Sequence, residues 1–191
     1  MFSMLASDAS AATLKAMLKI KIVVYCIAVW VVFGALDGSP AQAQNPRPIG
    51  SYGSWQALTF EEDGKSGCYV IAEPTRKEGN YTSRDEVYAL VTHRPDDDKL
   101  NVFTLIAGYT YQPDSTVTLE IGDETFSLST KDDNAWASDD DDPRIVEALK
   151  KGTGMVVRGI SSRGTETTDT YSLTGFTKAY NAIGEACKLT Q

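Results

Sequence analysis

The stretch STVTLEIGDETFSLST, residues 115–130, decides the expected fold because apolar and polar residues alternate along both of its halves. Successive side chains of a β-strand point to opposite faces, so Val117 and Leu119 would share one face. A two-residue turn at the central Gly-Asp pair would place Leu119 opposite Phe126 and Val117 opposite Leu128. Pattern and turn agree, and together they predict an antiparallel hairpin with one apolar face.

Similar alternation predicts further strands over residues 54–60, 68–72, 86–93 and 100–111. The last of these stretches is apolar on both faces, which is typical of a central strand. Polar loops rich in charged residues separate the strands.

Two short helices are also predicted. Asp142 is expected to cap a helix that has Pro143 at its first position and Gly152 as its stop. The second helix, residues 176–187, carries an apolar stripe that ends at Cys187. The expected fold is therefore mainly β: a β-sandwich or flattened barrel of antiparallel strands, closed by two short helices.

Residues 1–43 have the pattern of a cleavable signal peptide. Three lysines precede an apolar run at 22–36, which is shorter than the roughly 20 residues that a spanning helix needs. The Ala-Gln-Ala sequence at 41–43 predicts cleavage between Ala43 and Gln44. Translation is expected to begin at Met17, and the alternative for the whole segment is a membrane anchor.

Cleavage would leave 148 residues, which suffice for one domain. Residues 44–52 are expected to form a short linker and residues 53–191 a single domain, with no stable membrane span. Because the removed segment holds three lysines and two aspartates, the formal net charge changes from −8 to −9. This charge, and the lack of a basic stripe, argue against nucleic acid as a partner.

Cys68 and Cys187 are the two cysteines of the processed chain. An even number of cysteines in an exported protein predicts a disulfide, and the alternative is two buried free thiols. The chain-entropy model gives about 4–5 kcal/mol of stabilisation for so long a loop.

The polar stretch ISSRGTETTDTYSL, residues 160–173, lies between two alternating segments. One register pairs Met155 with Leu173 and Val157 with Tyr171, which leaves residues 162–166 as the loop of a hairpin. In that interpretation the threonine hydroxyls belong to the solvent face of the hairpin.

A functional interpretation of the same stretch is a recognition patch. Arg163 would protrude at the turn and, together with Thr165 and Asp169, bind a carboxylate, a phosphate or a sugar. Trp55 and Trp136 are expected to be buried anchors, with exposure on a binding face as the alternative.

Catalysis and metal binding have weaker sequence signals. His93 is the only histidine, ends a predicted strand and is expected at the surface. The alternative is that His93 acts as a general base together with nearby aspartates, in which case the protein would be a periplasmic hydrolase. The acidic runs 96–98 and 139–142 are candidates for a calcium-stabilised adhesin domain, although the spacing of an EF-hand is missing. No catalytic, cofactor or metal residue is assigned.

Several short motifs together resemble one protein family, the invasion-associated locus B family of small exported proteins from Gram-negative bacteria. The most specific block is SSRGT (161–165), DTYSL (169–173) and Gly175-Phe176. The other matching segments are Gly53-x-Trp55, Cys68-Tyr69, Pro74-Thr75, VTHRP (91–95), Gly108-Tyr109, Ala135-Trp136, MVVRG (155–159) and Cys187.

The resemblance spans about residues 52–187 and implies a β-rich domain in the periplasm, associated with the outer membrane or secreted. It links some members to invasion of host cells and implies no catalytic residues. We therefore expect a non-enzymatic envelope binding protein, whose partner would be an envelope or host-surface protein or a glycan.

Overall fold

The computed structural model describes residues 44–189. The predicted signal peptide, the predicted cleavage after Ala43 and the predicted start at Met17 fall on residues that lie outside this range. The strands are β1 (Gln44–Tyr52), β2 (Trp55–Glu62), β3 (Lys65–Ala72), β4 (Arg76–Gly79), β5 (Tyr88–Arg94), β6 (Lys99–Ile106), β7 (Thr116–Ile121), β8 (Glu124–Lys131), β9 (Asn134–Trp136), β10 (Gly154–Ile160) and β11 (Glu166–Ser172). The helices are η1 (Pro95–Asp97), α2 (Asp142–Lys151) and α3 (Phe176–Ala186).

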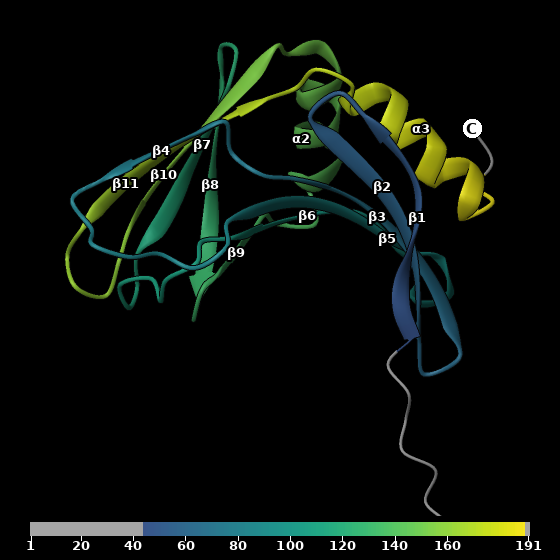
Figure 1. Ribbon diagram of the computed structural model, residues 1–191, viewed down its shortest axis with the longest axis horizontal. Helices are drawn as coiled ribbons and strands as arrows, with labels where there is room; N and C mark the ends of the chain where they lie inside the picture. Colours follow the sequence, from purple (N-terminus) through teal and green to yellow (C-terminus); the bar gives the residue numbers. More distant parts are fainter. Residues whose placement is uncertain (1–43, 190–191) are drawn as a thin grey trace, which may run out of the picture. The chain divides into compact units, whose positions relative to one another are not determined.

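All eleven strands form one antiparallel sheet in the order β1-β2-β3-β5-β6-β9-β8-β7-β10-β11-β4. In Figure 1, β6 runs between the group containing β7, β8, β10 and β11 and the group containing β1, β2 and β3. Helix α3 packs on β1, β2 and β3, and α2 packs on β6. The prediction of a mainly β fold with two helices is confirmed; the strands form one open sheet, and not a closed barrel.

The hairpin at residues 115–130 has the predicted register. Leu119 pairs with Phe126 and Val117 pairs with Leu128, and the turn residue Gly122 has a φ of +58°. All four apolar side chains of these pairs are buried. The local pattern was sufficient here because turn and alternation specify the same pairing.

The second hairpin has a different register from the one predicted. Met155 pairs with Tyr171 and Val157 with Asp169, which is a shift of two residues. A shift of two keeps every side chain on its face, so the apolar residues still point inward. The reason for the shift is a tight connection, in which the Ser161 N–H donates to the Thr165 carbonyl at 2.9 Å.

The prediction of a linker at 44–52 is wrong, because these residues form strand β1. The strand contains two prolines, Pro46 and Pro48, which cannot donate to the hydrogen-bond ladder. Strand β1 lies at the edge of the sheet, where only one side of the strand is paired. Register irregularities next to both prolines accommodate the missing donors.

Helix α3 carries the predicted apolar stripe and joins the early strands. Phe176 is buried against Trp55, with ring centroids 4.9 Å apart. Cys187, just after the helix, forms a disulfide with Cys68 of β3, and their Cα atoms are 6.1 Å apart. Trp55 is thus a buried anchor as expected. Trp136, however, is 39% exposed, because it lies on the outer face of β9.

Candidate functional site

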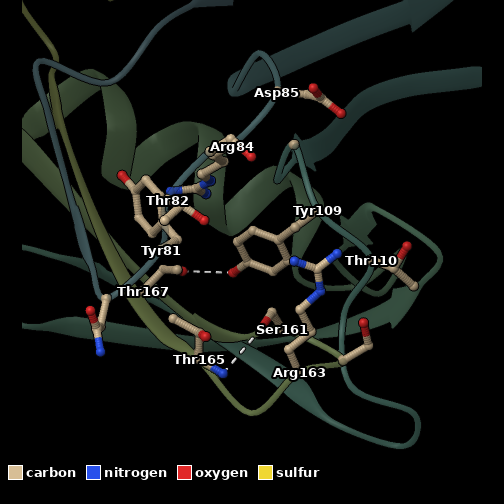
Figure 2. A pocket seen from close by; sticks show the side chains of 14 residues that line it. Tyr81, Thr82, Arg84, Asp85, Tyr109, Thr110, Ser161, Arg163, Thr165 and Thr167 are labelled. Carbon is tan, nitrogen blue, oxygen red and sulfur yellow. Dashed lines mark hydrogen bonds between the residues drawn. The ribbon is translucent and has the colours of Figure 1, made fainter.

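A polar pocket of about 460 Å³ lies where three distant segments of the chain meet. The segments are residues 80–85 after β4, residues 108–110 after β6, and the connection between β10 and β11 (Figure 2). The lining residues are Asn80, Tyr81, Thr82, Ser83, Arg84, Asp85, Gly108, Tyr109, Thr110, Ser161, Ser162, Arg163, Thr165 and Thr167. The volume is within the roughly 300–1,000 Å³ typical of small-molecule sites.

A buried ion pair supports one wall of the pocket. The Arg84 guanidinium donates from Nη1 to Asp169 Oδ1 at 2.7 Å and from Nη2 to Oδ2 at 2.6 Å. Its Nε donates to the Ala107 carbonyl at 2.6 Å. Both charged side chains are only 4% exposed. Three charge-assisted hydrogen bonds therefore hold the 80–85 segment against β11 and the end of β6.

Burial and pairing act on the pKa of Arg84 in opposite directions. Burial lowers the pKa of the guanidinium, but the hydrogen bonds and negative charge of Asp169 outweigh burial and raise it above its ordinary value. The guanidinium of Arg84 is therefore charged at any physiological pH. Because each charge neutralises the other, the base of the pocket carries no net charge.

Two tyrosines complete this wall. The Arg84 guanidinium carbon lies 4.8 Å from the ring centroid of Tyr109 and 5.7 Å from that of Tyr81. The Tyr109 hydroxyl and the Thr167 hydroxyl are 2.6 Å apart and share a hydrogen bond. Burial raises the pKa of Tyr109, so its hydroxyl stays protonated. Tyr81 remains 36% exposed and offers an aromatic face to solvent.

Glycines permit the close approach of the segments. Gly108 has a φ of +68°, and a Cβ atom on it would lie 2.5 Å from the Asp85 carbonyl oxygen. A Cβ atom on Gly159 would lie 2.9 Å from the Tyr109 hydroxyl oxygen. The Asp85 N–H donates to the Gly108 carbonyl at 3.0 Å, which fixes the first two segments to each other.

The 161–165 loop is held by its backbone, whereas its charged side chain is left free. Ser161 is buried and its Oγ accepts from the Thr165 N–H at 3.1 Å. The Ser162 N–H donates to the Thr110 carbonyl at 2.8 Å. Arg163 is exposed, and no described residue gives it a hydrogen bond or an ion pair. In Figure 2 its side chain extends from this loop toward the segment that carries Tyr109 and Thr110.

The three residues of the predicted recognition patch differ in their exposure to solvent. Arg163 and Thr165 both line the pocket, as the recognition hypothesis requires. Asp169 does not belong to the exposed patch, because it is 3% exposed and its carboxylate is occupied by Arg84. Asp169 lies on the inward face of the hairpin in the predicted register as well as in the observed one, and Arg84 supplies the partner that allows its charge to be buried.

Sequence reasoning missed the residues contributed by the other two segments. Arg84 and Tyr81 lie in a polar stretch that was interpreted as a solvent loop, and nothing local distinguishes Arg84 from the other cations there. Gly108-Tyr109 was singled out only as part of the family resemblance, and the strand predicted over residues 100–111 was too long, because β6 ends at Ile106 and residues 108–110 line the pocket.

His93 is not at the surface, so that expectation is wrong. Its side chain is fully buried, and Nδ1 accepts the Asn101 N–H at 3.0 Å while Nε2 has no partner among the described residues. Burial, and to a lesser extent the charge of Lys150, lower the pKa of His93 to about 4. The one hydrogen bond of the ring goes to the backbone of Asn101, and Asp96 of the neighbouring loop accepts the Ser66 N–H instead.

The acidic runs are engaged in structural contacts. Asp142 Oδ1 accepts the Phe103 N–H at 2.9 Å, which explains why it does not act as the helix cap that was predicted. Asp97 pairs with Lys65, and Asp139 pairs with Lys99 at 3.1 Å. Across residues 44–189, no group of three or more His, Cys, Asp or Glu side chains is placed to hold a metal ion.

Comparison with known proteins agrees with this architecture. The family described as "Invasion associated locus B (IalB) protein" matches residues 55–184, a range that contains every segment of the pocket. The chain belongs to this family. No curated protein matches the sequence.

A solved structure has a similar fold. The crystal structure of invasion associated protein b from Bartonella henselae is 17% identical, with a TM-score of 0.53, and the match covers 76% of this chain and 98% of that chain. At this identity the likeness to the IalB structure concerns the fold alone. Within residues 44–189, none of the helices has both the length and the apolar character needed to cross a membrane.

Proposed function

We propose that the protein is an exported, non-enzymatic binding protein of the cell envelope, and that it binds its partner through the pocket around Arg163. The observation that carries the proposal is the contrast between a rigid pocket wall and an unpaired cation at its rim. Arg84 is fully engaged by Asp169 and Ala107, whereas Arg163 has no partner among residues 44–189. Preorganised walls reduce the entropy that is lost on binding.

Export is supported by the sequence pattern of residues 1–43 and by the Cys68–Cys187 disulfide, a bond that persists in oxidising compartments. The periplasm is the compartment that we propose, with association to the outer membrane or secretion as further steps. The family name suggests a contribution to host-cell invasion, and such a role would use the same recognition surface.

The hydrolase alternative has less support from the geometry. A general base must reach the proton that it removes, either directly or through one water molecule. His93 is 0% exposed, and its one hydrogen bond joins Nδ1 to the backbone of Asn101. A pKa of about 4 also makes the ring a weak base at neutral pH.

Site-specific crosslinking in living cells tests the binding function. A photo-reactive residue at Ser162, in the pocket loop, should capture a partner in the intact envelope, and Arg163→Ala should abolish the capture. A photo-reactive residue at Ser127, exposed on β8 and absent from the pocket, is the matched control. Equal capture from both positions, or capture that persists in Arg163→Ala, would contradict the proposal.

A further inference from the structure

We infer that the pocket binds a sugar that carries a carboxylate, such as a uronic acid unit; this inference rests on the proposed binding function and names its ligand class. Three features of the pocket carry it: one uncompensated guanidinium, an exposed aromatic face, and a rim of hydroxyl groups. A uronic acid presents the complement of each of these on a single ring.

The charge balance selects a single negative group. Arg84 is neutralised by Asp169, so Arg163 is the only cation of the lining without a partner in the described residues. A guanidinium presents paired donors that match the two oxygens of a carboxylate. Asp85 also lines the pocket, and it lies at the opposite end from Arg163 in Figure 2.

A phosphate fits this balance poorly. It carries more negative charge than a carboxylate, and proteins commonly hold it with several cations or with backbone amides at a helix N-terminus. The lining has no helix, and one of its two arginines is already occupied. The carboxylate of Asp85 repels a phosphate more strongly than a singly charged carboxylate, and it can accept hydrogen bonds from the hydroxyls of a sugar.

The rest of the lining suits a hydroxyl-rich ring. The side chains of Thr82, Ser83 and Thr110 are exposed, and none of them makes a hydrogen bond to a described residue. These hydroxyls can both donate and accept, as sugar hydroxyls do. The exposed ring of Tyr81 offers a flat apolar face against which the C–H face of a sugar can pack.

The inference is tested by titrating the processed full chain with small probes and monitoring the NMR chemical shifts of the protein. The probes are glucuronate, glucose, acetate and inorganic phosphate, so that the ring and the charge are separated. Glucuronate should bind at least about tenfold more tightly than glucose or acetate, because a charge-assisted hydrogen bond adds to the ring contacts. A short oligomer of uronic acids distinguishes a polysaccharide source from a free sugar.

Matched variants assign the contacts. Arg163→Ala should weaken glucuronate binding at least about tenfold and leave glucose binding unchanged. Arg158→Ala is the control, because Arg158 is exposed on β10 and paired with Glu120 outside the pocket. Tyr81→Ala should weaken the binding of both glucuronate and glucose. Tyr81→Phe keeps the aromatic face and should bind both sugars as tightly as the wild type does.

Each other outcome overturns the inference. Equal affinity for glucose and glucuronate would remove the role of the carboxylate, and phosphate binding as strong as glucuronate would indicate an unselective anion site. Absence of any sugar binding, with crosslinking from Ser162 still dependent on Arg163, would reject the sugar and leave the binding function intact.

Discussion

Arg84 and Asp169 are 85 residues apart in the sequence, yet their side chains form a two-pronged ion pair with hydrogen bonds of 2.7 and 2.6 Å. The pair fastens the segment after β4 to strand β11 and so positions two of the three walls of the pocket. Both side chains are almost wholly removed from solvent, so each charge depends on the other.

Breaking this pair should destabilise the fold strongly. Asp169→Asn leaves the Arg84 charge buried without a counterion, and we expect a loss of about 3–5 kcal/mol in the free energy of unfolding. Urea denaturation measures the loss. Asp123→Asn, in an exposed turn, is the control and should change stability by less than about 0.5 kcal/mol. The double variant Arg84→Met/Asp169→Leu removes both charges and should lose less unfolding free energy than Asp169→Asn does. A larger loss in the double variant would contradict the pairing argument.

The buried His93 makes stability fall as the pH falls. Its pKa is lowered from 6.5 to about 4 in the folded protein, so between these values the unfolded chain binds a proton that the folded protein does not. The contribution of His93 to the free energy of unfolding is about 3 kcal/mol. It is fully present above pH 6.5 and is lost progressively as the pH falls to about 4. Urea denaturation at pH values from 7 to 4 measures this effect. The loss of unfolding free energy over that range should be smaller in His93→Gln than in the wild type. An unchanged pH profile would show that His93 is accessible.

Asp142 acts in the opposite direction. Burial is the main cause that raises its pKa from 3.8 to about 6 in the folded protein, so the folded state binds the extra proton. Its contribution to stability is fully present below pH 3.8 and is lost as the pH rises through about 6, again about 3 kcal/mol. Asp142→Asn retains an acceptor for the Phe103 N–H and should therefore be more stable than the wild type at pH 7 but not at pH 3.5. Equal stability at both values of pH would be evidence against a raised pKa.

The disulfide should account for a large part of the stability. Cys68 and Cys187 are separated by 119 residues, and the chain-entropy model predicts a contribution of about 4–5 kcal/mol for such a loop. A reductant should lower the urea midpoint of the wild type and have no effect on Cys68→Ala/Cys187→Ala. Mass spectrometry of the unreduced protein should detect no free thiol at either position, and alkylation of both would refute the bond.

Gly108 should not tolerate a side chain. Alanine there would have to adopt a φ of +68° and bring its Cβ atom to 2.5 Å from the Asp85 carbonyl oxygen. The left-handed conformation alone costs about 1–2 kcal/mol. Because the close approach to Asp85 adds to this cost, Gly108→Ala should lower the free energy of unfolding by more than that value. Gly184→Ala is the control, because its Cβ atom would meet open space within helix α3 and should be neutral or slightly stabilising. Circular dichroism melts of the two variants provide the comparison.

The local features of the fold could be predicted because they depend on neighbouring residues. The hairpin register around Leu119 follows from alternation and a two-residue turn. Helix α3 and the position of Cys187 follow from an apolar stripe with helical spacing. Strand β1 carries no clear local signal, because its prolines Pro46 and Pro48 are tolerated in a strand only at the edge of a sheet.

The candidate site could be predicted only in part. Arg163 and Thr165 were predicted together because both stand in one short polar loop, and both line the pocket. The burial of Asp169 depends on Arg84, and the burial of His93 depends on packing against Tyr180 of helix α3, with ring centroids 5.3 Å apart. Contacts between such distant residues leave no local signal.

The sequence by itself determined the strand periodicity, the two helices and the cysteine pair, because each depends on spacing along the chain. Only the tertiary structure decided which charges are free and which are neutralised, because that depends on the order of strands in the sheet. The pairing of β11 with β4 and β10 brings the Arg163 loop to the segment after β4, and burial then separates Asp169 from solvent.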